Sequence, residues 1–141
     1  MGQINIIGVL KGGLAAAVIM NISQYILNLP VAGAQMAQEL AARNLPPAES
    51  AGQIAMFAVS TTILGFITVF VYAAIRPRLG PGPKTAMAAG LVVWSASYLY
   101  AAILAGTIGV YSMGLVVVII LWSLVEMLVA SAVGGFLYNE S

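Results

Sequence analysis

The chain contains neither cysteine nor histidine. Without cysteine there can be no disulfide, no thiol nucleophile and no thiolate metal site. Without histidine the chain lacks the usual zinc and haem ligand and the commonest general base of enzymes. We therefore expect no cofactor, no bound metal and no conventional active site.

Charged residues are also scarce. They make up 6% of the 141 residues, whereas hydrophobic residues make up 62%. Soluble domains carry about 25% charged residues, so this chain cannot build a surface suited to water. The formal net charge is only +1. The sequence also has no basic stripe that the phosphates of a nucleic acid could follow. Lipid must be the solvent for most of the chain, and no nucleic-acid partner is expected.

Four apolar stretches are long enough to cross a membrane as helices, which takes about 20 residues. They cover approximately residues 4–29, 53–75, 84–105 and 113–138. Pro30 is expected to close the first stretch, and the Pro- and Gly-rich segment Arg76–Pro83 to separate the second from the third. Because backbone groups in lipid must find partners within their own segment, all four stretches are predicted to be helical. The predicted fold is an all-α, four-transmembrane-helix bundle that forms one domain over residues 1–141.

The first apolar stretch has a second interpretation, as a signal peptide with its cleavage site at Ala32–Gly33–Ala34. Its apolar run is longer than the ~7–15 residues of a signal h-region. Its polar face, described below, also suits a helix that packs in a bundle. We therefore expect a retained span.

Positive charges are distributed unevenly between the two sides of the predicted bundle. Lys11, Arg76, Arg78 and Lys84 flank one side, whereas only Arg43 lies on the other. Because Lys and Arg are concentrated in cytoplasmic segments, both termini are predicted to be cytoplasmic.

The connection formed by residues 30–52 is the one sizeable segment outside the predicted spans. Val31–Asn44 is Ala-rich and is predicted to form a short helix that ends before the pair Pro46–Pro47. Met36 and Leu40 share one side of it, which is typical of an interfacial helix that lies on the membrane. The alternative is a lid or docking surface outside the membrane.

Small residues recur four positions apart in three of the spans, a pattern that lets helices approach closely in lipid. The pairs are Gly8 with Gly12, Ala86 with Gly90, and Ala130 with Gly134. They predict a compact bundle and say nothing about function.

Polar side chains from all four spans are predicted to form one intramembrane cluster. On the first span, Asn21, Gln24, Tyr25 and Asn28 have helical spacing and share a face. The predicted topology brings this face to the level of polar residues on the other spans. The candidate site residues are Glu126, Asn21, Gln24, Tyr98, Ser123 and Thr61.

Glu126 stands out because an ionisable side chain at the centre of a span costs about 2.5–3.5 kcal/mol on insertion scales. No Lys or Arg lies at a matching depth in the sequence. We therefore expect a protonated carboxyl that is hydrogen-bonded to Asn21, Gln24 or Tyr98. Three roles are open: fastening the fourth helix to the first, binding a cation, proton or polar substrate, or meeting a charged group on a partner protein.

Three cations, Arg76, Arg78 and Lys84, lie around the second connection. At the level of the headgroups each is worth about 1 kcal/mol of attraction to anionic lipid. Lipid anchoring and topology explain these residues, and a docking site for an acidic partner is the alternative.

The run from Tyr72 to Ala86, which contains Arg-Pro-Arg-Leu-Gly-Pro-Gly-Pro-Lys and is followed by Gly90 and Trp94, resembles small four-helix membrane proteins predicted in many bacterial genomes. The segments 122–126 and 134–138 add to the resemblance, which covers nearly the whole chain. It implies a bacterial inner (plasma) membrane and carries over no established activity. Small multidrug transporters also combine four helices with a membrane glutamate. They are shorter and carry that glutamate in the first helix, where this chain has none.

These observations predict a non-enzymatic structural or accessory subunit that contacts membrane lipid and either a larger membrane complex or further copies of itself. The alternative is a small oligomeric transporter or channel in which Glu126 and the polar cluster line the route. A membrane enzyme that acts on lipid would have to rely on Glu126 with a tyrosine or serine, and it is the least favoured hypothesis.

Overall fold

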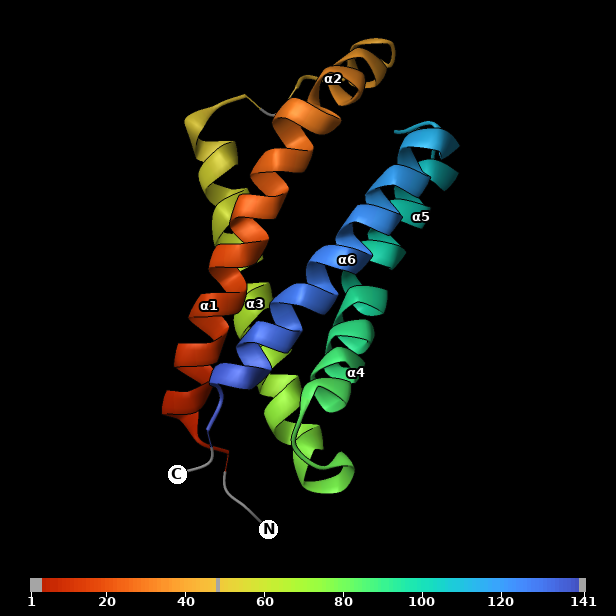
Figure 1. Ribbon diagram of the computed structural model, residues 1–141. Coiled ribbons are helices and arrows are strands. Elements are labelled where there is room, and N and C mark those ends of the chain that lie inside the picture. Colours follow the sequence, from red (N-terminus) through yellow and green to blue (C-terminus); the bar gives the residue numbers. More distant parts are fainter. Residues whose placement is uncertain (1–3, 48, 140–141) are drawn as a thin grey trace.

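The computed structural model describes residues 4–47 and 49–139, and every regular element among them is helical. Four helical stretches are long and apolar enough to span a membrane: Ile6–Val31, Ala51–Leu79, Pro83–Thr107 and Met113–Leu137. The prediction of an all-α protein with four candidate spans is therefore confirmed. Both termini lie at the same end of the bundle (Figure 1), which follows from an even number of crossings.

Two of the spans contain a π-helical turn, which forms the end of the first span and interrupts the third. The first consists of α1 (Ile6–Ile26) and η1 (Leu27–Val31), and the third of α4 (Pro83–Trp94), η2 (Ser95–Leu99) and α5 (Tyr100–Thr107). The second and fourth are the uninterrupted helices α3 (Ala51–Leu79) and α6 (Met113–Leu137). Ser50 begins α3 with a capping box, in which its hydroxyl accepts from the Gln53 amide at 3.2 Å.

The prediction that Pro30 closes the first helix is wrong. The helix widens into η1, where the amide of Ala32 bonds to the carbonyl of Leu27 at 2.8 Å. A π-turn closes a larger ring than an α-turn. In an α-helix the proline ring would clash with the carbonyl four residues earlier. The wider π-turn leaves room for the ring, and the span continues to Val31.

The second connection is also shorter than predicted, because Arg76–Leu79 remains helical. Pro77 lies in the last turn of α3, where its missing amide costs a single helical bond. The reversal itself is made by Gly80 and Gly82, whose φ angles are 81° and 127°. Glycine adopts such positive φ values without steric cost.

The helices pack most closely at the end that carries the termini. There α1 and α4 each pack along both α3 and α6. A Cβ atom on Gly12 would lie 2.3 Å from the carbonyl oxygen of Gly134, and one on Gly65 would lie 2.7 Å from the amide nitrogen of Ala17. All members of the three predicted small-residue pairs are buried, so the expected close packing is confirmed.

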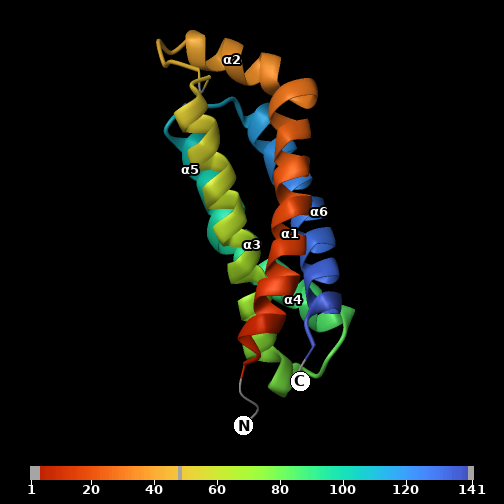
Figure 2. The ribbon, with the colours of Figure 1, turned by 90° about the vertical axis from the view of Figure 1, so that its left-hand side faces the viewer.

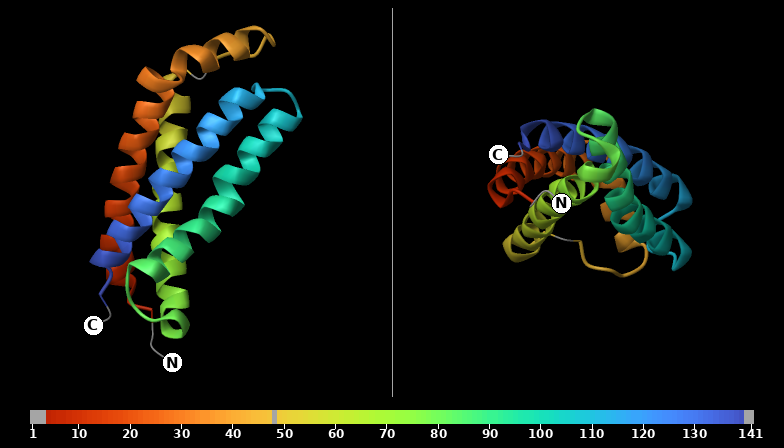
Figure 3. Two further views of the ribbon diagram at one scale, coloured as in Figure 1. Left: turned by 45° about the vertical axis from the view of Figure 1, so that its right-hand side comes forward. Right: turned by 90° about the horizontal axis from the view of Figure 1, so that it is seen from below.

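Toward the opposite end the bundle opens. There α3 diverges from α5 and α6 (Figures 1 and 3), whereas the end of the first span stays packed against α6 through the buried cluster of Leu27, Ala32 and Leu115. Every residue from 51 to 60 in α3 is exposed, and Ala102 is the one buried residue of α5. The first part of α3 is therefore left without a close helical partner in the described chain.

A short helix, α2 (Gly33–Ala41), forms within the predicted segment and lies across the open end (Figure 2). Glu39 on α2 accepts hydrogen bonds from the Ser112 amide at 2.5 Å and from the Ser112 hydroxyl at 2.6 Å. Arg43 donates through Nε to the carbonyl of Gly109. These contacts, called the α2 clasp below, join the first connection to the loop between α5 and α6.

The α2 clasp changes the pKa of Glu39. The hydroxyl of Ser112, followed by its amide and the side chain of Gln35, holds the pKa of Glu39 below its usual range, because each donor stabilises the ionised carboxylate. Ionised Glu39 is therefore the form that makes the clasp.

Candidate functional site

Glu126 lies near the middle of α6 on the face that packs against the other spans. It is 4% exposed, and its neighbours on that face, Ser123 and Met127, are completely buried. From Glu126 the helix continues for roughly 15–20 Å in both directions at 1.5 Å per residue. The carboxyl group is thus placed at mid-span and inside the bundle.

Three hydrogen bonds reach the carboxyl group. The side-chain amide of Gln24 on α1 donates to Oε1 at 3.1 Å and to Oε2 at 3.0 Å. The hydroxyl of Tyr98 on η2 donates to Oε1 at 3.0 Å. The predicted contacts of Glu126 with Gln24 and Tyr98 are therefore present, and they connect the first, third and fourth spans.

The orientation of the Gln24 amide is set by Asn28, one helical turn further along. Asn28 donates through Nδ2 to the Gln24 side-chain oxygen at 3.1 Å and to its backbone carbonyl at 2.8 Å. Because the oxygen of the amide group is engaged by Asn28, its nitrogen is turned toward Glu126. Asn28 itself is exposed, so this chain of amides leads from the buried carboxyl to the surface of η1.

Hydroxyl groups complete the cluster from two further directions. Thr61 on α3 lies near the Tyr98 hydroxyl, and Ser23 on α1 lies near the Glu126 carboxyl, each close enough to interact with it. Thr61 thereby brings the second span to the site. We use the term carboxyl cluster for Glu126, Gln24, Tyr98, Thr61, Ser23 and Asn28.

Two predicted members lie close to this cluster but do not bond to the carboxyl. Asn21 was one of three alternative partners for Glu126, and its amide donates instead to Thr62 at 3.1 Å and to the carbonyl of Ala17 at 2.9 Å. Of the three alternatives, Gln24 and Tyr98 are therefore the ones that bond to the carboxyl, and Asn21 is turned toward α3. Ser123 is buried and accepts from the indole of Trp94 at 3.0 Å.

The predicted shared face of the first span is also incomplete. Tyr25 is 67% exposed and points away from the bundle. Ser23, two positions earlier in the sequence, is the residue that the sequence reasoning missed. It accepts from the indole of Trp122 at 2.9 Å. A tryptophan inside a span needs an acceptor for its N–H. This requirement could have identified Ser23 from the sequence.

The three basic residues around the second connection, Arg76, Arg78 and Lys84, lie at the opposite end from α2. The Arg76 guanidinium stacks 5.5 Å from the ring centre of Tyr138, within the range of a cation–π contact. Tyr138 meets Tyr72 edge to face at 5.8 Å, and the Tyr72 hydroxyl accepts from the Gly82 amide at 3.3 Å. Arg78 and Lys84 are exposed. Arg76 is thus half-buried and built into the packing, while the other two face outward.

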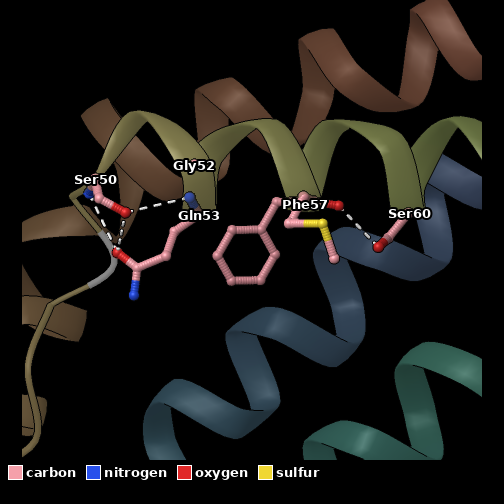
Figure 4. Close-up of a pocket in the computed structure, with 6 residues that line it drawn as sticks. Ser50, Gly52, Gln53, Phe57 and Ser60 are labelled. Carbon is pink, nitrogen blue, oxygen red and sulfur yellow. Dashed lines mark hydrogen bonds between the residues drawn. The ribbon is translucent and has the colours of Figure 1, made fainter.

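An open hollow of about 460 Å³ lies along the first part of α3 (Figure 4). Its lining residues are Ser50, Gly52, Gln53, Met56, Phe57 and Ser60. None of them belongs to the carboxyl cluster, so the hollow and the cluster are separate features.

No known family, curated protein or solved structure matches this chain in sequence or in fold.

Proposed function

We propose that the chain is a non-enzymatic membrane protein that serves as a structural or accessory subunit of a membrane complex. The observation that carries this proposal is the contrast between the two halves of the bundle. One half is closely packed through glycines, whereas every residue from 51 to 60 in α3 is exposed. A partner helix that packs on this part of α3 would complete the bundle.

The hydrogen bonding of the carboxyl cluster supports a role other than catalysis. The Glu126 carboxyl is occupied by Gln24 and Tyr98. The hydroxyls of Ser23 and Ser123 each accept from a tryptophan indole. A nucleophile needs a neighbouring base that is free to take its proton, and these side chains are engaged in holding helices together.

Photo-crosslinking in native membranes tests the proposal. A photoreactive amino acid at Phe57, which is 63% exposed on α3, should give a discrete adduct with one protein of defined mass. The matched control is Val125, which is also 63% exposed but lies on α6. It should give lipid adducts. Lipid adducts at both positions in a protein that purifies as a monomer would contradict the accessory role.

A small oligomeric transporter or channel is the second candidate, favoured by the chain of amides that connects Glu126 with exposed Asn28. Proton- or ion-dependent flux into liposomes that contain the protein should then be lost in Glu126→Gln and kept in Tyr100→Phe. Tyr100 is exposed and lies outside the carboxyl cluster. Equal flux in both variants would exclude this candidate.

We further propose that the protein resides in a bacterial inner membrane with both termini in the cytoplasm and with α2 at the opposite interface. Exposed Lys11, Arg78 and Lys84 at the end that carries the termini support this orientation through the preference of cations for the cytoplasmic side. The same cations suit anionic headgroups.

The chain has no native cysteine, so single cysteines report the orientation directly. A membrane-impermeant maleimide added to intact cells should label Ala42→Cys and spare Asn139→Cys, both of which replace exposed residues. The reverse pattern would overturn the orientation.

A further inference from the structure

We infer that Glu126 is a proton-binding site that exchanges its proton with the water on the α2 side of the membrane and not with the water on the other side. This inference goes beyond the accessory role and does not depend on it. It follows from three features of the carboxyl cluster: the absence of a cation, the reversibility of its hydrogen bonds, and the difference between its two approaches.

The carboxyl group has no cationic partner within the described residues. The groups that interact with it are Ser23, Gln24 and Tyr98. Of these, Tyr98 is the one that can titrate, and α3 contributes the neutral Thr61. A lone carboxylate is costly inside a membrane, and carrying a proton removes that cost. The charge of the Glu126 carboxylate is therefore neutralised by a bound proton and not by an ion pair.

The cluster can accommodate both protonation states without moving its side chains. A hydroxyl group can donate or accept, whereas an amide nitrogen can only donate. When Glu126 is ionised, the Tyr98 hydroxyl and the Gln24 amide both donate to it, at 3.0–3.1 Å. When Glu126 carries a proton, its Oε1 hydroxyl can donate to the Tyr98 oxygen instead. Loss of the proton to a water molecule therefore leaves a carboxylate that already has its donors.

The approach from the α2 side is polar. Gln24 contacts the carboxyl, Asn28 contacts Gln24, and Asn28 is exposed. Asn28 lies three residues before the end of the span at Val31, which is about 5 Å along the helix axis. Two amide side chains thus lead from the carboxyl to within about 5 Å of the end of the first span, and they offer donors and acceptors to water along this path.

The approach from the other side is closed. The hydroxyls of Thr68 and Ser131 lie on this side, but they bond to the carbonyls of Leu64 and Leu128 in their own helices, at 2.8 and 3.1 Å. At Ser131 and beyond it, the helices touch through glycine. A Cβ on Gly90 would lie 2.5 Å from the Ser131 hydroxyl oxygen, and one on Gly134 would lie 2.6 Å from the Val69 side chain. Such contacts leave no room for a chain of water molecules.

Infrared spectroscopy of the protein in liposomes tests the inference. The carbonyl-stretch band of a protonated carboxyl should be present in the wild type and absent in Glu126→Gln. After transfer to deuterated buffer, the rate at which this band shifts reports proton exchange. Asn28→Leu should slow the shift about tenfold, since it removes the polar step at the membrane edge. Asn28→Ser, which keeps a polar group there, should exchange at close to the wild-type rate.

Thr68→Val is the matched control on the closed side, because it removes a hydroxyl at nearly constant volume. It should exchange at the wild-type rate. Thermal unfolding of each variant in the same liposomes confirms that the compared proteins are folded. Absence of a band that depends on Glu126 would overturn the proton site. An unchanged rate in folded Asn28→Leu, or slow exchange in Thr68→Val, would overturn its one-sided access.

Discussion

The side-chain amide of Gln24 donates to both carboxyl oxygens of Glu126, at 3.1 and 3.0 Å, across 102 positions of sequence. This contact joins the first span to the last at mid-membrane. Tyr98 and Thr61 extend it to the remaining two spans. Among the residues that the structure describes, Glu126 is the one acidic residue inside a span, and it lies where side chains from all four spans meet.

Removing the carboxyl should destabilise the bundle. Glu126→Ala leaves the Gln24 amide and the Tyr98 hydroxyl without an acceptor, and we expect a loss of about 1–3 kcal/mol. Glu126→Gln keeps the shape and one acceptor oxygen, so its loss should stay below about 1 kcal/mol. Unfolding in detergent, followed by circular dichroism, measures both. A Glu126→Ala protein as stable as the wild type would show that the contact contributes nothing to the fold.

Tyr98 offers a finer test of the same cluster. Tyr98→Phe removes one donor to Oε1 and should cost about 0.6–1.7 kcal/mol, the range seen for hydrogen bonds between membrane helices. Tyr100→Phe is the matched control, because Tyr100 is 66% exposed and lies on the opposite face of the span. Its stability should be that of the wild type. Equal losses in the two variants would point to a general effect of the hydroxyl groups.

The sequence was sufficient for the four spans because their apolar length is set by the membrane, and the structure contains four such helices. It also predicted the contacts of Gln24 and Tyr98 with Glu126, since a buried carboxyl needs donors at its own depth. The sequence could not decide which of Asn21, Gln24 and Tyr98 would reach the carboxyl, because the rotation of a helix about its axis depends on packing. The role of Ser23 and the continuation of the first helix through Pro30 were missed for a related reason. Both depend on the local backbone and side-chain geometry, which the residue type alone does not determine.

The glycine contact between α1 and α6 should tolerate no side chain. Gly12→Ala would place its Cβ 2.3 Å from the carbonyl oxygen of Gly134. The backbone cannot yield as a flexible side chain does, so the helices must separate, at a cost of about 1–3 kcal/mol. Gly114→Ala is the control, since its Cβ would meet nothing within 4 Å. If the two variants melted at the same temperature, the close approach of the helices would be irrelevant to stability.

The α2 clasp should open in acid. Donors from Ser112 lower the folded-state pKa of Glu39, so the clasp is fully formed above the ordinary pKa of a glutamate and is lost as the pH falls through the lowered value. Spin labels at Gln38→Cys and Ile108→Cys, both exposed positions, should therefore move apart at acidic pH.

Glu39→Gln should show the longer label distance already at neutral pH, because it removes the charge that attracts the donors. Glu49→Gln, an exposed acidic position outside the clasp, should behave as the wild type. A label distance that stays constant with pH and in Glu39→Gln would show that the clasp does not hold α2 in place.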